Sequence, residues 1–143
     1  MKKDISFLIL YMEVNSMRAT EAEENYLEII LILNMIQSRV RATDVAKRLD
    51  RSRASTSEAL KKLKDKDHIY IREDGHISLT ESGNKIANAT YEKYKCIYNV
   101  LRHLGVPKHI AFKDACKIEH RISEESFQVL KRQYLGYEYK YEF

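Results

Sequence analysis

Hydrophobic positions recur at three- and four-residue intervals along most of the chain, which predicts a mainly α-helical protein. The first predicted helix covers about residues 21–38 and begins at a capping box, Thr20-Glu21-Ala22-Glu23. A short second helix follows, capped by Thr43 and reaching Leu49. After a tight turn, Ser52 can cap a third helix that extends to about Lys66.

The pattern then changes to the alternation that is typical of strands. Ile69–Glu73 and His76–Leu79 are the two predicted strands, and the Asp74-Gly75 pair between them is a strong hairpin signal. Three helices followed by a small β-ribbon are the pattern of a winged helix-turn-helix. We therefore predict a DNA-binding domain over residues 20–79.

Helical periodicity returns in the last part of the chain and predicts a second, helical domain over residues 80–143. Its helices are expected from Thr80 to about Leu104, from Pro107 to about Arg121, and from Ser123 to about Leu135. Long amphipathic helices of this kind carry more apolar surface than a small fold can cover. The domain is therefore expected to form a homodimer.

Both ends of the chain leave alternatives open. Residues 1–19 form an N-terminal extension that either packs on a partner or on the DNA-binding half, or is a loosely docked tail. The tail over residues 137–143 alternates polar and aromatic side chains, which is compatible with a strand or with a docking arm.

Composition narrows the class of protein. The 143 residues suffice for one domain or for two small ones that share an interface. Two cysteines are too few for a disulfide scaffold and fit a reducing cytosol. The apolar run Ile5–Met12 is too short to span a bilayer and lacks a small-residue cleavage site. We therefore expect a cytoplasmic protein with no membrane partner.

Positive charge is concentrated in the helix-turn-helix. Residues 39–72 contain eleven basic and five acidic side chains, which is an electrostatic footprint for double-stranded DNA. A solvated helix face, or a winged helix used only for protein contacts, is the alternative. Small hydroxyl groups allow close approach to bases, and basic side chains reach phosphates. On this basis the candidate DNA-binding residues are Arg51, Ser52, Arg53, Ser55, Ser57, Lys61 and Lys62.

A second constellation consists of Cys116, Glu119 and His120. Their spacing of three and four residues predicts that one helix face presents a thiol, a carboxylate and an imidazole, all of which are ligands of transition metals. The alternative is a buried cysteine beside a solvent-exposed Glu–His pair. A metallohydrolase is a remote alternative, because a nucleophile turn, a Gly-rich phosphate loop and a second carboxylate pair are missing from the sequence. We therefore expect that this protein is not an enzyme.

Several stretches resemble the diphtheria toxin repressor family, which includes the manganese transport regulators. These stretches are Glu24–Glu28, Thr43–Leu49, Leu79–Gly83, Leu104–Val106 and Asp114–Ser123. The resemblance implies a homodimeric transcriptional repressor that binds a palindromic operator when iron(II) or manganese(II) is bound. Carried over residue by residue, it implies a metal site of Asn25, Glu28, Cys116, Glu119 and His120.

The chain also departs from the family pattern. Asn25 stands where members usually carry Met or Asp, and Phe112 stands where iron-type members carry a ligand His. Tyr94 and Tyr98 replace ligands of the family's second metal site, which we therefore expect to be absent or rebuilt. Cys116 follows the iron-type pattern and favours softer metals such as iron(II), cobalt or zinc. An alternative interpretation is a regulator of the same fold that has lost its response to metal.

Overall fold

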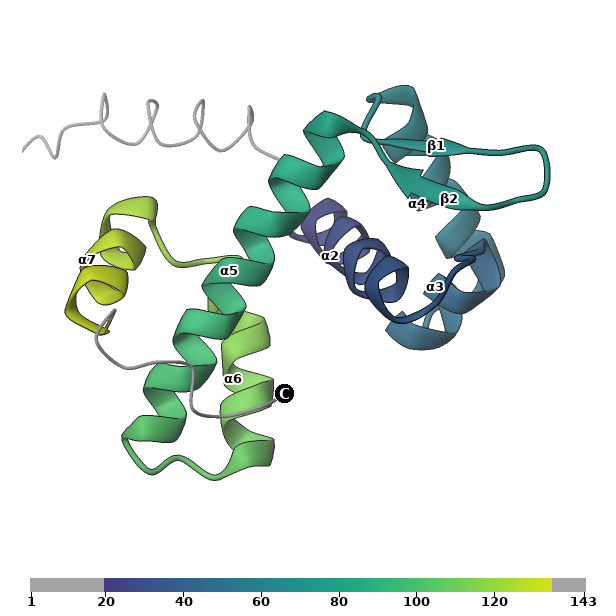
Figure 1. The fold of residues 1–143 in the computed structure, drawn as a ribbon. Coiled ribbons are helices and arrows are strands. Elements are labelled where there is room, and N and C mark those ends of the chain that lie inside the picture. Colours follow the sequence, from purple (N-terminus) through teal and green to yellow (C-terminus); the bar gives the residue numbers. More distant parts are fainter. Residues whose placement is uncertain (1–19, 135–143) are drawn as a thin grey trace, which may run out of the picture.

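The computed structural model describes residues 20–134. The N-terminal extension over residues 1–19 and the aromatic tail over residues 137–143 lie outside the described residues. The described chain is mainly helical, with one half that contains a two-stranded wing and a second half of helices only (Figure 1). The predicted fold class is therefore confirmed.

Helix α2 (Glu21–Ile36) begins at the predicted capping box. The Thr20 hydroxyl accepts a hydrogen bond from the Glu23 backbone N–H at 3.2 Å, and the Glu23 carboxylate accepts one from the Thr20 backbone N–H at 3.1 Å. One face of the helix is buried, and this face includes Leu27, Glu28 and Ile30. A carboxyl group thus lies among the apolar side chains of α2.

Helices α3 (Ala42–Leu49) and α4 (Arg53–Asp65) complete the helix-turn-helix. The expected cap at Thr43 is wrong, because Arg41 is the cap residue and α3 begins at Ala42, two residues earlier than a cap at Thr43 would place it. The Asp44 carboxylate accepts a hydrogen bond from the Arg41 backbone N–H at 2.8 Å and so holds the chain just before the helix. Ser52 caps α4 as predicted, since its hydroxyl accepts from the Ser55 backbone N–H at 3.1 Å.

The wing consists of strands β1 (Ile69–Ile71) and β2 (Ile77–Leu79), which pair antiparallel with Ile69 opposite Leu79. Both strands are shorter than predicted because the turn takes up residues 72–76. Gly75 has a φ of 84°, a left-handed conformation that glycine adopts without strain. The wing is joined to the α2–α3 connection by a hydrogen bond from the Ile77 N–H to the carbonyl of Val40 at 2.8 Å.

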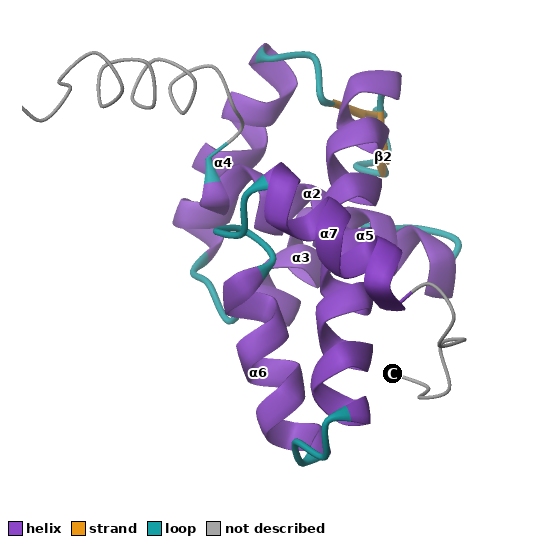
Figure 2. Ribbon diagram, turned by 90° about the vertical axis from the view of Figure 1, so that its left-hand side faces the viewer, coloured by secondary structure: helices purple, strands orange, loops and turns teal. Residues whose placement is uncertain are grey.

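Helix α5 (Glu81–His103) links the two halves of the molecule (Figures 1 and 2). Its first part packs against α2, and its remaining length packs against α6 (Lys108–Ile118) and α7 (Glu124–Tyr134). Where the sequence predicted that α6 continues to Arg121, the helix ends at Ile118. The backbone N–H groups of Arg121 and Ile122 both donate to the Ile118 carbonyl, so the chain turns there towards α2.

The hydrophobic side chains form two cores. One lies within the winged half and includes Leu27, Leu63 and Ile77, and the other lies between α5 and α6 around Tyr98 and Ala115. Within residues 20–134, no helix combines the length and the apolar character that crossing a membrane requires. At the seam between the two cores, where α2 faces the turn after α6, two carboxyl side chains are buried, those of Glu28 and Glu119.

Candidate metal centre and nucleic-acid interface

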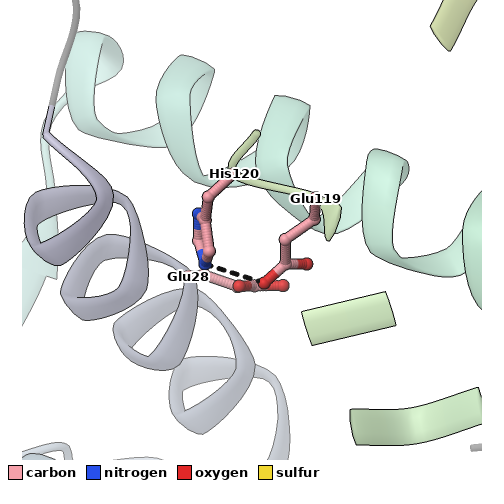
Figure 3. A group of neighbouring side chains, drawn as sticks. All are labelled: Glu28, Glu119 and His120. Atoms are coloured by element: carbon pink, nitrogen blue, oxygen red, sulfur yellow. Dashed lines mark ion pairs between the residues drawn. The ribbon is translucent and has the colours of Figure 1, made fainter. Parts of the chain in front are cut away.

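Three potential metal ligands meet at the seam between the two halves. Glu28 comes from α2, and Glu119 and His120 come from the turn that follows α6 (Figure 3). One ligand atom from each of the three residues lies within 4.8 Å of the other two. Glu28 and Glu119 are buried, and the side chain of His120 is only 1% exposed. Two carboxyls and an imidazole are thus shielded from water together.

His120 is the centre of the hydrogen bonds at this seam. Its Nε2 lies 2.8 Å from Oδ1 of Asn25 and 3.0 Å from Oε1 of Glu119. Its Nδ1 lies 2.8 Å from Oε2 of Glu24. The ring therefore donates from both nitrogens when it is protonated, and it joins the start of α2 to the end of α6.

The buried groups hold their protons tightly. Burial, together with the neighbouring Glu119 carboxyl, raises the pKa of Glu28 to about 9. Burial also raises the pKa of Glu119, although the hydrogen bond from His120 opposes that rise. Burial alone lowers the pKa of His120, but its bonds to Glu119 and Glu24 outweigh this and raise the pKa to about 9. At neutral pH, Glu28 is therefore protonated and neutral. The ring of His120 is also protonated, and its positive charge faces the side chains of Glu119 and Glu24.

The residues at the seam fit a divalent transition metal. Oε2 of Glu119 is buried and has no hydrogen-bond partner within residues 20–134. Buried polar atoms nearly always have a partner, so this oxygen is free to act as a ligand. Carboxylate oxygen and imidazole nitrogen together suit manganese, iron and zinc. An ion at this position would bond to both halves of the molecule.

Cys116 lies near this cluster but is not one of its three close members. It is half-buried in the last turns of α6, whereas Glu119 and His120 lie in the turn beyond the helix. The helix thus ends earlier than predicted, although Glu119 still has helical backbone angles and its N–H donates to the carbonyl of Ala115. Burial and the carboxyls of Glu119 and Glu28 raise the pKa of the Cys116 thiol to about 12. Metal would have to displace the proton of this thiol for sulfur to act as a ligand.

Aromatic side chains occupy the neighbouring part of α5. The rings of Tyr94 and Tyr98 stack with their centroids 5.9 Å apart, and Phe112 packs edge-on against Tyr94 at 6.0 Å. Both tyrosines are buried, and burial raises the pKa of Tyr94 above its ordinary range. Tyr94 and Tyr98, the positions that the resemblance assigns to a second metal site, thus belong to a buried core.

The candidate DNA-binding residues all lie on the exposed side of the helix-turn-helix. Arg51 precedes α4, Ser52 is its cap, and the other five project from the helix: Arg53, Ser55, Ser57, Lys61 and Lys62. Lys62 also forms an exposed ion pair with Glu58, at 3.2 Å. The opposite face of α4, which includes Leu60 and Leu63, packs into the core of the winged half. The helix therefore presents hydroxyl and basic groups together to solvent.

Sequence reasoning missed Glu24 as part of this site. Glu24 lies four residues before Glu28, so the two share one face of α2. The sequence shows that spacing, but it does not show that Glu24 contacts the ring of His120, because the two residues are 96 positions apart.

A winged DNA-binding half joined at a buried ligand cluster to a helical half defines a class of metal-regulated DNA-binding protein. The profile described as "Iron dependent repressor, N-terminal DNA binding domain" matches residues 18–77. The profile described as "Iron dependent repressor, metal binding and dimerisation domain" matches residues 80–137. The chain therefore belongs to the iron-dependent repressor family.

Individual relatives agree with this assignment. The transcriptional regulator MntR of Escherichia coli O6:H1 is 30% identical over 121 residues, which cover 85% of this chain and 78% of MntR. The structure of T. acidophilum IdeR is 27% identical with a TM-score of 0.69, and the match covers 78% of this chain and 53% of IdeR. The manganese regulator SloR is 25% identical with a TM-score of 0.71, and the match covers 85% of this chain and 56% of SloR.

Family membership settles the class of activity. Members are DNA-binding transcriptional repressors regulated by iron or manganese, and they are not enzymes. The hydrolase alternative is thereby removed.

Proposed function

We propose that this chain represses transcription in the cytoplasm as a homodimer on a palindromic operator, in response to iron(II) or manganese(II). The observation that carries the proposal is the buried cluster of Glu28, Glu119 and His120 at the seam between the two halves. The profile matches over residues 18–77 and 80–137 support a boundary between the halves near residue 80.

Within the proposed site, each residue has a distinct part. Glu28 and Glu119 supply anionic oxygens, and His120 supplies a neutral nitrogen. Asn25, whose oxygen accepts from the ring of His120, adds a weaker neutral donor. A divalent ion bound by these residues would supply the positive charge that lets both carboxyls ionise side by side. Cys116, from the adjacent turns of α6, is the proposed sulfur ligand, and it favours iron(II) over manganese(II).

The seam explains how metal would influence DNA binding. Glu28 belongs to the DNA-binding half, whereas Glu119 and His120 belong to the helical half. Ligands drawn from both halves favour one relative position of those halves, and in a dimer they favour one separation of the two recognition helices. Operators with half-sites about 34 Å apart require such a fixed separation. The metal can shift the equilibrium between this arrangement of the two halves and any other only to the extent that it binds the two arrangements with different affinity.

The helical half offers a surface for the second copy of the chain. Ile110 and Phe112 on α6 are 41% and 52% exposed, although both are large and apolar. Phe112 also lines a hollow of about 390 Å³, together with Tyr94 and Tyr98. We propose that this face of α5 and α6 lies in the dimer interface. Phe112→Glu is then expected to yield monomers in sedimentation experiments, while Val129→Glu on α7 leaves the dimer intact.

Calorimetric titration tests the proposed metal site. Purified, metal-free protein is titrated with Mn²⁺, with Zn²⁺ and, without oxygen, with Fe²⁺. We expect saturable binding that is lost in His120→Ala and in Glu119→Gln, and retained in His109→Ala, which changes an exposed histidine on α6. If the wild-type chain binds none of these ions, the protein is a regulator of this fold without metal control, and the proposal is wrong.

A further inference from the structure

The second nitrogen of the His120 ring is held by a residue outside the proposed ligand set. Nδ1 lies 2.8 Å from Oε2 of Glu24, while Nε2 faces Asn25 and Glu119. The two nitrogens project from different edges of the ring, so Glu24 and the ligand cluster lie on different sides of it. The side chain of Glu24 is 23% exposed and that of His120 is 1% exposed, so the bond is largely shielded from water.

This arrangement has a clear chemical consequence. An imidazole binds metal through one nitrogen while the other carries a proton. A carboxylate that accepts this second proton fixes the tautomer and the orientation of the ring, and it makes the free nitrogen a stronger donor. We infer that Glu24 is a positioning residue that holds Nε2 of His120 towards the metal site. The inference rests on the proposed function and concerns a residue that does not itself touch the ion.

The bond also crosses the seam. Glu24 is part of α2 in the DNA-binding half, and His120 is part of the helical half. The ring is therefore oriented only while α2 is seated against the turn that follows α6. Displacement of α2 weakens metal binding through the loss of this bond, in addition to the loss of Glu28. By linkage, bound metal stabilises the seated position of α2 to the same extent.

A neighbouring ion pair provides the matched control. Glu21 lies in the same first turn of α2 and pairs with Arg121, the residue after His120, at 3.4 Å. Their side chains are 47% and 77% exposed, so this pair contributes little. Glu21→Gln thus removes the same charge from the same helical turn without altering the ring of His120.

Two measurements test the inference in the full-length protein. In calorimetric titration with Mn²⁺, Glu24→Ala lowers the affinity about 10- to 100-fold, the range typical for removal of a carboxylate that orients a ligand. Glu24→Gln, which keeps an acceptor oxygen, lowers the affinity less, and Glu21→Gln changes it less than about twofold. In metal-free protein, nitrogen-15 NMR shows both ring N–H groups of His120 protected from exchange. In Glu24→Ala only the Nδ1–H loses this protection.

The outcomes separate the possible roles of Glu24. Mn²⁺ affinity in Glu24→Ala close to that of the wild type overturns the inference. Loss of both ring N–H signals, with lowered melting temperatures in both Glu24 variants, assigns Glu24 a purely structural role and also overturns it. A wild-type chain that binds no metal overturns the proposed function instead. The NMR measurement on metal-free protein then still decides whether Glu24 orients the ring.

Discussion

The buried carboxyl of Glu28 makes the stability of the metal-free protein depend on pH, and Glu28→Gln tests this dependence. Burial and the neighbouring Glu119 carboxyl raise the pKa of Glu28 from 4.5 to about 9. The folded chain therefore keeps this proton to a higher pH than the unfolded chain does. The stability that this group contributes is complete below about pH 4.5 and is lost as the pH rises through about 9.

The magnitude follows from the two pKa values. At about pH 7 the unfolded chain has ionised this carboxyl and the folded chain has not. The interval from the ordinary pKa of 4.5 to pH 7 corresponds to about 3 kcal/mol in favour of unfolding. Glutamine is neutral in both states. Glu28→Gln is therefore expected to raise the free energy of unfolding by about 3 kcal/mol at pH 7, and by almost nothing near pH 4.5.

Urea unfolding in the presence of a chelator measures this effect at a single protein concentration across the pH range. Glu58→Gln is the control, because Glu58 is exposed and pairs with exposed Lys62, so its replacement changes the free energy of unfolding by less than about 1 kcal/mol. A difference between Glu28→Gln and wild type that does not grow with pH would refute the reasoning. So would a loss of stability at pH 7, because either result means that Glu28 is ionised in the folded chain.

Three further predictions concern other parts of the fold. In Gly83→Ala the new Cβ would lie 1.9 Å from the backbone oxygen of His68, so we expect a loss of at least about 2 kcal/mol in urea unfolding. Thr56 buries a hydroxyl oxygen with no partner in the described part of the chain, and Thr56→Val is expected to raise the melting temperature through a gain of about 1 kcal/mol. Lys61→Ala should lower the dependence of DNA affinity on salt by about one counterion, and an unchanged slope argues against a phosphate contact at this exposed lysine.

Local features of the chain were predictable from the sequence. The capping box at Thr20, the Ser52 cap and the wing around Gly75 all depend on residues within a few positions of one another. The chemistry of a capping side chain, or of a glycine in a turn, is the same wherever the segment is placed. These elements were therefore found at or close to their predicted residues.

The arrangement of the seam was less predictable, because it depends on tertiary contacts. Periodicity extended α6 through His120, but the chain leaves the helix after Ile118 and brings the imidazole onto α2. The bond from His120 to Glu24 joins residues 96 positions apart, and its geometry is not encoded in local spacing. The high pKa of Glu28 likewise results from burial against the other half of the molecule.

The central claim is that an ion at the seam controls the affinity of the protein for DNA, and one measurement tests this claim most directly. The probe is a fragment of genomic DNA that is selected by its binding to this protein. Fluorescence anisotropy measures the affinity of the protein for this fragment in the presence of Mn²⁺ and in the presence of a chelator, at constant ionic strength. We expect an affinity at least about tenfold higher with Mn²⁺, within the usual range of coupling between two sites. The His120→Ala variant should show no such gain. Equal affinity of the wild-type protein under both conditions would contradict the account.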